Sequence, residues 1–151
     1  MMIMKYPYRL LQTLGGLLGA LWLCAAAPAP PALHRIDLDG IWRFAPEPAD
    51  GVSCRQWASP GFDDGAWREL RSDAGWKQQG VEHSGFGWYR KWIDIPDDCR
   101  GIPLSLTFGE ICYDDDVFFN GVRIGGLRGP YKYRNLISRL YAVPDSLIRF
   151  G

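Results

Sequence analysis

Apolar and polar residues alternate along much of this chain, which is the period-two pattern of half-buried β-strands. The clearest case places four large apolar residues at every second position: Ile102, Leu104, Leu106 and Phe108. The positions between them are Pro, Ser and Thr. We therefore predict a strand with one buried face over residues 102–108, and Pro103 favours an edge strand or the start of a strand.

Three other segments also give strand signals. Residues 41–44 follow an Asp-Gly turn, and the larger pair, Trp42 and Phe44, is expected to face the core. Residues 86–95 also alternate, with the stems of long cationic side chains expected to lie on aromatic rings. A further strand is predicted over residues 140–144, followed by a capped turn over residues 145–148.

The strongest local signal is Asn120-Gly121 between two apolar runs, residues 117–119 and 122–124. Asn and Gly tolerate the positive φ that a two-residue hairpin turn requires. The sequence therefore predicts a β-hairpin at this position.

Turn residues separate these strands. The segment Phe-Asp-Asp-Gly-Ala-Trp, residues 62–67, holds one helical turn at most. Asp63 or Asp64 is expected to accept hydrogen bonds from backbone N–H groups just ahead, with Phe62 and Trp67 facing the interior. Many short strands, tight turns and no long helix predict an all-β sandwich or jelly roll.

The amino-terminal region has a different character. Lys5 and Arg9 precede an apolar run over residues 10–23, and small residues lead into Pro28, which is the layout of a secretory signal peptide. We expect cleavage after Ala26, an Ala/Pro linker over residues 27–33 and a domain over residues 34–151. The expected location is therefore periplasmic or secreted.

Two alternatives to cleavage after Ala26 remain. An uncleaved segment would anchor the protein in the membrane, although the apolar run is near the lower length limit for a span. Cys24 would allow lipidation, but Leu23 is larger than the residue that a lipoprotein peptidase prefers.

Composition narrows the choice of partners. The chain is 47% hydrophobic and 23% charged, which excludes a disordered tail. Lys plus Arg equals Asp plus Glu at 17 each, so nucleic acid is not an expected partner. Loss of residues 1–26 would remove two basic side chains and leave a net charge of about −2.

Three cysteines would remain in an oxidising compartment: Cys54, Cys99 and Cys112. They allow one disulfide with one thiol left over, and the sequence leaves the pairing open. Their spacing matches no zinc pattern. We expect no metal and no cofactor.

Four segments in order resemble the amino-terminal sugar-binding domain of glycoside hydrolase family 2, a galactose-binding-domain-like jelly roll. These segments are Leu38–Phe44, Phe62–Trp67, Gly85–Lys91 and Phe119–Gly125. The resemblance covers about residues 34–151 and implies a jelly-roll β-sandwich. Similar jelly rolls occur in bacterial carbohydrate esterases and in periplasmic parts of membrane signalling proteins, which residues 139–144 resemble equally.

The resemblance also implies that this jelly roll lacks its last strand. In such domains a Gly like Gly151 is usually followed by an Asn and an alternating strand that closes the sheet. We therefore expect a fragment of a longer protein, with the catalytic glutamates in C-terminal domains that are missing here.

Glycoside hydrolysis requires two carboxyl groups about 5–10 Å apart. Asp114, Asp115 and Asp116 supply carboxylates, but adjacent strand residues point to opposite faces. We interpret them as a solvated turn in which one Asp caps backbone N–H groups, with a calcium site as the alternative. No catalytic residue is predicted.

Six of the seven tryptophans follow residue 26, and three of them, Trp42, Trp67 and Trp88, occupy motif positions expected in the core. Three other residues are candidates for ligand binding: Trp76, His83 and Tyr131. The alternative for Trp76 and Tyr131 is core or lid packing, and for His83 it is a polar loop role.

The sequence thus predicts a non-catalytic accessory or carbohydrate-binding-like domain of an exported glycoside hydrolase, and not an enzyme by itself. The expected partners are carbohydrate and the missing C-terminal domains, with membrane contact only through an uncleaved amino terminus. A periplasmic ligand-sensing domain of a membrane signalling protein and an independent carbohydrate-binding module are the alternatives. Sugar specificity and oligomeric state stay open.

Overall fold

The computed structural model describes residues 35–48, 54–111, 113–129 and 136–151, all within the unit His34–Gly151. Seven strands lie in these ranges: β1 (Ile41–Pro46), β2 (Arg68–Arg71), β3 (Gly87–Arg90), β4 (Leu104–Glu110), β5 (Asp115–Phe119), β6 (Val122–Leu127) and β7 (Ser138–Val143). Short 3-10 turns accompany them at Arg55–Ala58, Lys77–Gln79, Asp97–Cys99 and Asp145–Leu147. Across the described ranges, no helix has the length and apolar character needed to span a membrane. The expected signal peptide and linker lie outside these ranges.

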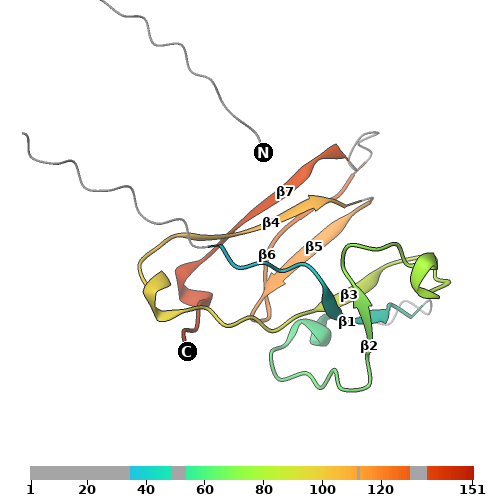
Figure 1. Ribbon diagram of the computed structural model, residues 1–151, viewed down its shortest axis with the longest axis horizontal. Coiled ribbons are helices and arrows are strands. Elements are labelled where there is room, and N and C mark those ends of the chain that lie inside the picture. The colour runs from blue at the N-terminus through green and yellow to red at the C-terminus, as the bar shows by residue number, and fades with distance from the viewer. Residues whose placement is uncertain (1–34, 49–53, 112, 130–135) are drawn as a thin grey trace, which may run out of the picture. The chain divides into compact units, whose positions relative to one another are not determined.

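The strands pair antiparallel in three sheets, ordered β2-β1-β3, β4-β7 and β5-β6 (Figure 1). The all-β prediction is confirmed, and the antiparallel sheets are consistent with a β-sandwich. The jelly-roll strand order stays a prediction. In β4 the apolar stripe is half-buried while the alternating positions are exposed, and Pro103 directly precedes the strand.

The hairpin of β5 and β6 is confirmed. Phe119 pairs with Val122, and the two turn residues have φ of 47° at Asn120 and 87° at Gly121. The Asn120 side chain donates a hydrogen bond to the Leu147 carbonyl at 2.8 Å, which ties the turn to the 3-10 turn after β7. A Cβ atom on Gly121 would lie 3.3 Å from Pro60, so the turn also packs closely against that loop.

The sheet β2-β1-β3 has a core of Phe44, Leu70 and Val81, with Trp76 and Tyr89 packed against it. Phe44 is 1% exposed, as expected from its place in β1, whereas Trp42 is half-buried. The sequence analysis did not predict β2, because its four residues contain only one apolar side chain. That side chain, Leu70, is nevertheless buried in the core.

A cluster of aromatic rings connects this sheet to the hairpin. The ring centroid of Trp57 lies 5.0 Å from that of Trp67 and 6.1 Å from that of Trp88. Trp88 in turn stacks on Phe118 of β5, with centroids 5.5 Å apart. The cluster therefore links β3 to β5.

Two strand-end predictions need correction. The strand expected over residues 86–95 ends at Arg90, because β1 supplies partners only as far as the pair Arg43 and Arg90. The turn after β7 is present, but no side chain of its cap position makes the expected hydrogen bond.

The Asp63 prediction is confirmed, since its carboxylate accepts a hydrogen bond from the Gly65 N–H at 2.9 Å.

A buried ion pair joins β5 to β7. The Nε of Arg139 lies 2.8 Å from Oδ1 of Asp115, and the side chains are 2% and 8% exposed. The Tyr141 hydroxyl donates to the other carboxylate oxygen, and burial together with Asp115 raises the pKa of Tyr141 to about 12. Gly125 lies beside this group, and a Cβ atom there would clash with the Tyr141 ring.

Replacing Gly121 with Val should destabilise the hairpin, since a β-branched residue is strained at this positive φ. We expect a loss of about 1–3 kcal/mol in the free energy of unfolding, measured by urea denaturation. Gly61→Ala is the control, because Gly61 has no such φ and a Cβ atom there has room. Equal stability of Gly121→Val and the native chain would refute this interpretation.

Replacing Arg139 with Met should leave a buried, unpaired Asp115 carboxylate. The expected loss is about 3–5 kcal/mol of unfolding free energy. The matched control, Arg100→Met, removes an exposed ion pair with Asp97 and should change stability by less than about 1 kcal/mol. If Arg139→Met does not fold, adding Asp115→Leu should restore folding; similar effects for Arg139→Met and the control would contradict the prediction.

Candidate functional site

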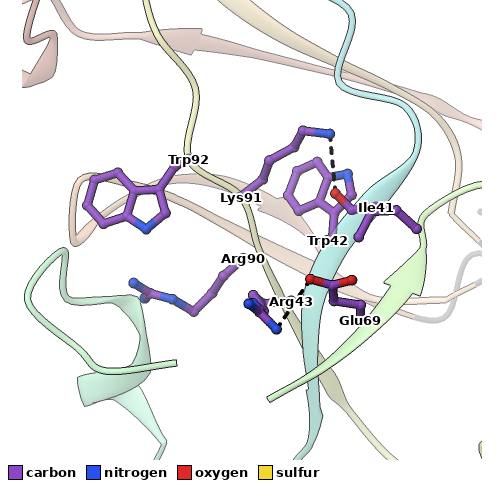
Figure 2. A pocket seen from close by; sticks show the side chains of 7 residues that line it. All are labelled: Ile41, Trp42, Arg43, Glu69, Arg90, Lys91 and Trp92. Atoms are coloured by element: carbon purple, nitrogen blue, oxygen red, sulfur yellow. Dashed lines mark hydrogen bonds and ion pairs between the residues drawn. The ribbon is translucent and has the colours of Figure 1, made fainter. Parts of the chain in front are cut away.

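A shallow depression of about 150 Å³ lies on the sheet β2-β1-β3 (Figure 2). Its lining combines two indoles, three cations, one carboxylate and one aliphatic side chain. The residues are Ile41, Trp42, Arg43, Glu69, Arg90, Lys91 and Trp92. They come from β1, from β2 and from the end of β3 together with the two residues that follow it.

Trp92 is the most accessible aromatic residue of the depression. Its side chain is 68% exposed, and it lies two residues beyond the end of β3. Figure 2 shows its indole on one side of the hollow, with Ile41 and Trp42 on the other. Ile41 is also exposed, at 51%. The depression therefore presents apolar surface to solvent on both sides.

Arg43 and Glu69 form the polar part of the depression. They are opposite one another in the β1–β2 register, and Nη1 of Arg43 lies 3.4 Å from Oε1 of Glu69. The same Nη1 also donates to the Trp67 carbonyl at 3.2 Å. Their side chains are 41% and 58% exposed, so a cationic hydrogen-bond donor and an anionic acceptor both face solvent at this point.

The other two cations are held by the protein. The ammonium of Lys91 donates to the carbonyls of Leu38, Asp39 and Ile41 at 3.1, 3.2 and 3.3 Å. It also lies 5.5 Å from the centroid of the Trp42 ring, which confirms that a cation packs on an aromatic ring here.

Arg90 is fixed in a similar way. Its Nε lies 2.8 Å from Oδ2 of Asp64, and its guanidinium also donates to the Ser59 carbonyl at 3.1 Å. The side chains of Arg90 and Asp64 are only 12% and 18% exposed. Arg90 and Lys91 thus shape the depression, while Arg43, Glu69 and Trp92 remain accessible to a ligand.

This arrangement suits binding more than acid–base chemistry. Glu69 is the carboxylate among the seven lining residues, and it is engaged by Arg43. Glycoside hydrolysis uses two carboxyl groups with separate roles, and this depression supplies one. An exposed indole beside polar groups matches a ligand that has both an apolar face and hydroxyl groups.

Trp76 and His83, two of the residues expected to bind ligand, lie together and are not among the residues that line this depression. The Trp76 indole is half-buried, its centroid is 5.3 Å from that of Phe44, and its Nε1 donates to the Tyr89 hydroxyl at 2.7 Å. The His83 ring centroid lies 5.8 Å from that of Trp76, and its Nε2 is 3.0 Å from the Phe86 carbonyl oxygen. A ligand-binding role for the two stays a prediction, and Tyr131 lies outside the described residues.

The sequence analysis did not single out Arg43, Glu69 or Trp92. Trp92 belongs to an alternating run that also contains Trp88, and alternation does not show where the neighbouring strand ends. Arg43 and Glu69 become neighbours only through the register of β1 and β2. Their opposite charges are compatible with that pairing, but many other pairs in the sequence satisfy the same condition.

The interpretation of Asp114, Asp115 and Asp116 as a solvated turn is wrong for the last two residues. Asp115 and Asp116 begin β5 and point to opposite faces, as strand geometry requires. Asp115 is paired with the buried Arg139, and Asp116 Oδ1 lies 2.8 Å from Nε of Arg123 while Oδ2 contacts Arg128. Among the described residues, no group of three or more His, Cys, Asp or Glu side chains is placed to hold a metal ion.

Two of the three cysteines are within the described ranges. Cys54 and Cys99 are buried, at 3% and 2% exposure. Burial raises the pKa of the Cys99 thiol, and the nearby Asp98 carboxylate acts in the same direction. Cys112 is not described, so the disulfide pairing stays open.

The chain is similar to known glycoside hydrolases. A β-galactosidase of Bacteroides ovatus, BoGH2A, is 31% identical over 123 residues, which cover 73% of this chain and 14% of that enzyme. A β-glucuronidase of Paenibacillus borealis is 26% identical over 102 residues, which cover 63% of this chain and 16% of that enzyme. The resemblance to the amino-terminal domain of glycoside hydrolase family 2 is confirmed.

The similarity to these two enzymes covers only a small part of their length. The chain spans about one seventh of the length of these two enzymes, and no family model matches it. The F1 capsule-anchoring protein of Yersinia pestis is 36% identical over 69 residues, which cover 46% of this chain and 7% of that protein.

Replacing Asp116 with Asn should lower stability near neutral pH but not in acid. Burial raises the pKa of this carboxyl, but hydrogen bonds from Arg128 and Arg123 outweigh burial and hold it below its ordinary value. The ionised group therefore stabilises the fold above the unfolded pKa of about 4, and this contribution is lost as the pH falls through the folded pKa.

We expect Asp116→Asn to lower the free energy of unfolding by about 0.2–1 kcal/mol near neutral pH. Urea unfolding at several pH values should show the difference shrinking below about pH 4. The double variant Arg123→Met with Arg128→Met should follow the same pH dependence, since it removes the partners of the same carboxylate. A difference that is constant with pH would contradict the assignment.

Proposed function

We propose that this chain is a non-catalytic accessory domain of an exported glycoside hydrolase of the family 2 type. It would pack against, or help to shape, the substrate entrance of the catalytic domain. The similarity to a β-galactosidase and a β-glucuronidase supports the link to glycoside hydrolases. The signal-peptide pattern of residues 1–26 supports export.

The observation that carries the non-catalytic role is that the three acids of the described fold with buried arginine-paired carboxylates are structural partners. Asp64, Asp115 and Asp116 each pair with an arginine at 2.8 Å, and all three carboxylates are at least three-quarters buried. A general acid or nucleophile for glycoside hydrolysis must instead face the sugar. Glu69, the carboxylate of the depression, is accessible but has no second carboxylate among the residues that line the hollow.

The purified full chain should not hydrolyse nitrophenyl β-galactoside or nitrophenyl β-glucuronide. Release of nitrophenol should equal that of a buffer blank, while a known β-galactosidase serves as the positive control. Turnover that is lost in the variant Glu69→Gln would contradict the proposal and would place catalysis in the depression. Turnover that Glu69→Gln retains would contradict it as well and would point to another site.

The coding sequence that adjoins this chain gives a second test. A catalytic glycoside hydrolase domain in the same reading frame would support an accessory role. A membrane-spanning segment followed by a signalling output domain would contradict it and would favour a ligand sensor.

A further inference from the structure

We propose that the depression on the sheet β2-β1-β3 binds one pyranose ring of a neutral saccharide, with Trp92 as the stacking surface and the Arg43–Glu69 pair as the hydroxyl contact. This inference deepens the proposed function and rests on it for its biological setting.

Trp92 supplies an apolar surface that the fold itself does not cover. An indole that is 68% exposed leaves a large apolar area in water, and covering this area is favourable by the hydrophobic effect. The face of the ring is the negative end of its quadrupole. The C–H groups on one face of a pyranose ring carry partial positive charge, so they are a suitable partner for this surface.

Arg43 and Glu69 supply the polar half of the contact. A sugar hydroxyl both donates and accepts, so neighbouring hydroxyls can bind a carboxylate and a guanidinium that lie 3.4 Å apart. Charge-assisted hydrogen bonds of this kind are about twice as strong as neutral ones. Both side chains keep exposed area for such contacts while they remain paired with each other.

The distribution of charge favours a neutral sugar over an acidic one. The ammonium of Lys91 already donates to three carbonyls, and Arg90 is bound to Asp64. Arg43 is the remaining cation among the lining residues, and its guanidinium is paired with the Glu69 carboxylate. An anionic ligand would therefore meet a like charge beside the one accessible guanidinium.

The volume limits the ligand to one ring. Pockets that enclose a complete small-molecule ligand usually measure about 300–1,000 Å³, and this depression measures about 150 Å³. It therefore suits one ring or the end of an oligosaccharide. A contact of this size gives weak affinity, with a Kd on the order of 1 mM.

The test is a titration of the isotope-labelled full chain with methyl β-galactoside and, separately, with glucuronate, followed by NMR. We expect the indole N–H signal of Trp92, assigned by its absence in Trp92→Phe, to shift with methyl β-galactoside. Trp92→Ala should raise the Kd at least about tenfold, Trp92→Phe should raise it less, and Glu69→Gln should also weaken binding. Glucuronate should bind more weakly than methyl β-galactoside.

Tyr113→Ala is the matched control, because Tyr113 is an aromatic residue of similar exposure, 70%, and is not among the lining residues. It should leave the Kd unchanged. The proposal is overturned if no signal shifts at roughly 50 mM sugar, well above the expected Kd. It is also overturned if Trp92→Ala binds as the native chain does, or if glucuronate binds better.

The same variants distinguish this inference from the proposed function. Turnover of nitrophenyl glycosides by the chain would contradict the accessory role. The titration results described above would still decide whether the sugar site is correct. Failure of the titration, with no turnover, would remove the sugar site and leave the accessory role standing. A Trp92→Ala variant that loses only its association with a catalytic domain would show that the depression is a protein contact and would overturn the sugar site.

Discussion

The buried pair of Arg139 and Asp115 is the interaction on which the rest of the described fold depends. Two charges removed from water destabilise a protein unless each finds its partner and further hydrogen bonds. Here the carboxylate accepts from both Arg139 and Tyr141, and the guanidinium also donates to the carbonyls of Ile111 and Tyr113. These contacts hold β7 against β5 and the loop before it, so the packing of the hairpin follows from satisfying one charge pair.

Charge neutralisation also positions the cationic side chains on the sheet β2-β1-β3. Arg90 and Lys91 lie where β3 ends, and their charges are neutralised by Asp64 and by backbone carbonyls, respectively. The next residue, Trp92, is exposed. The depression thus combines two cations held by the protein with one exposed indole.

Three buried carboxylates of the described fold have a structural use. Asp64, Asp115 and Asp116 each pair with an arginine and so hold strands and loops together. Trp76, selected from the sequence because it lies among polar residues, has its indole against Phe44 instead. Flanking residues are a weak guide to exposure, because a 3-10 turn at Lys77–Gln79 can direct a neighbouring side chain inward.

Local chemistry determined the features that the sequence predicts well. The Asn120-Gly121 hairpin, the alternation in β4 and the Asp63 turn each depend on residues a few positions apart, so their φ preferences and periodicity are visible in the sequence. The tertiary structure alone decided the buried ion pair of Asp115, the exposure of Trp92 and the formation of β2. The partner of Asp115 lies 24 residues away, and the register that joins Arg43 to Glu69 depends on strand pairing across a loop. Such long-range contacts are chosen by packing and charge compensation in the folded chain, which no local pattern encodes.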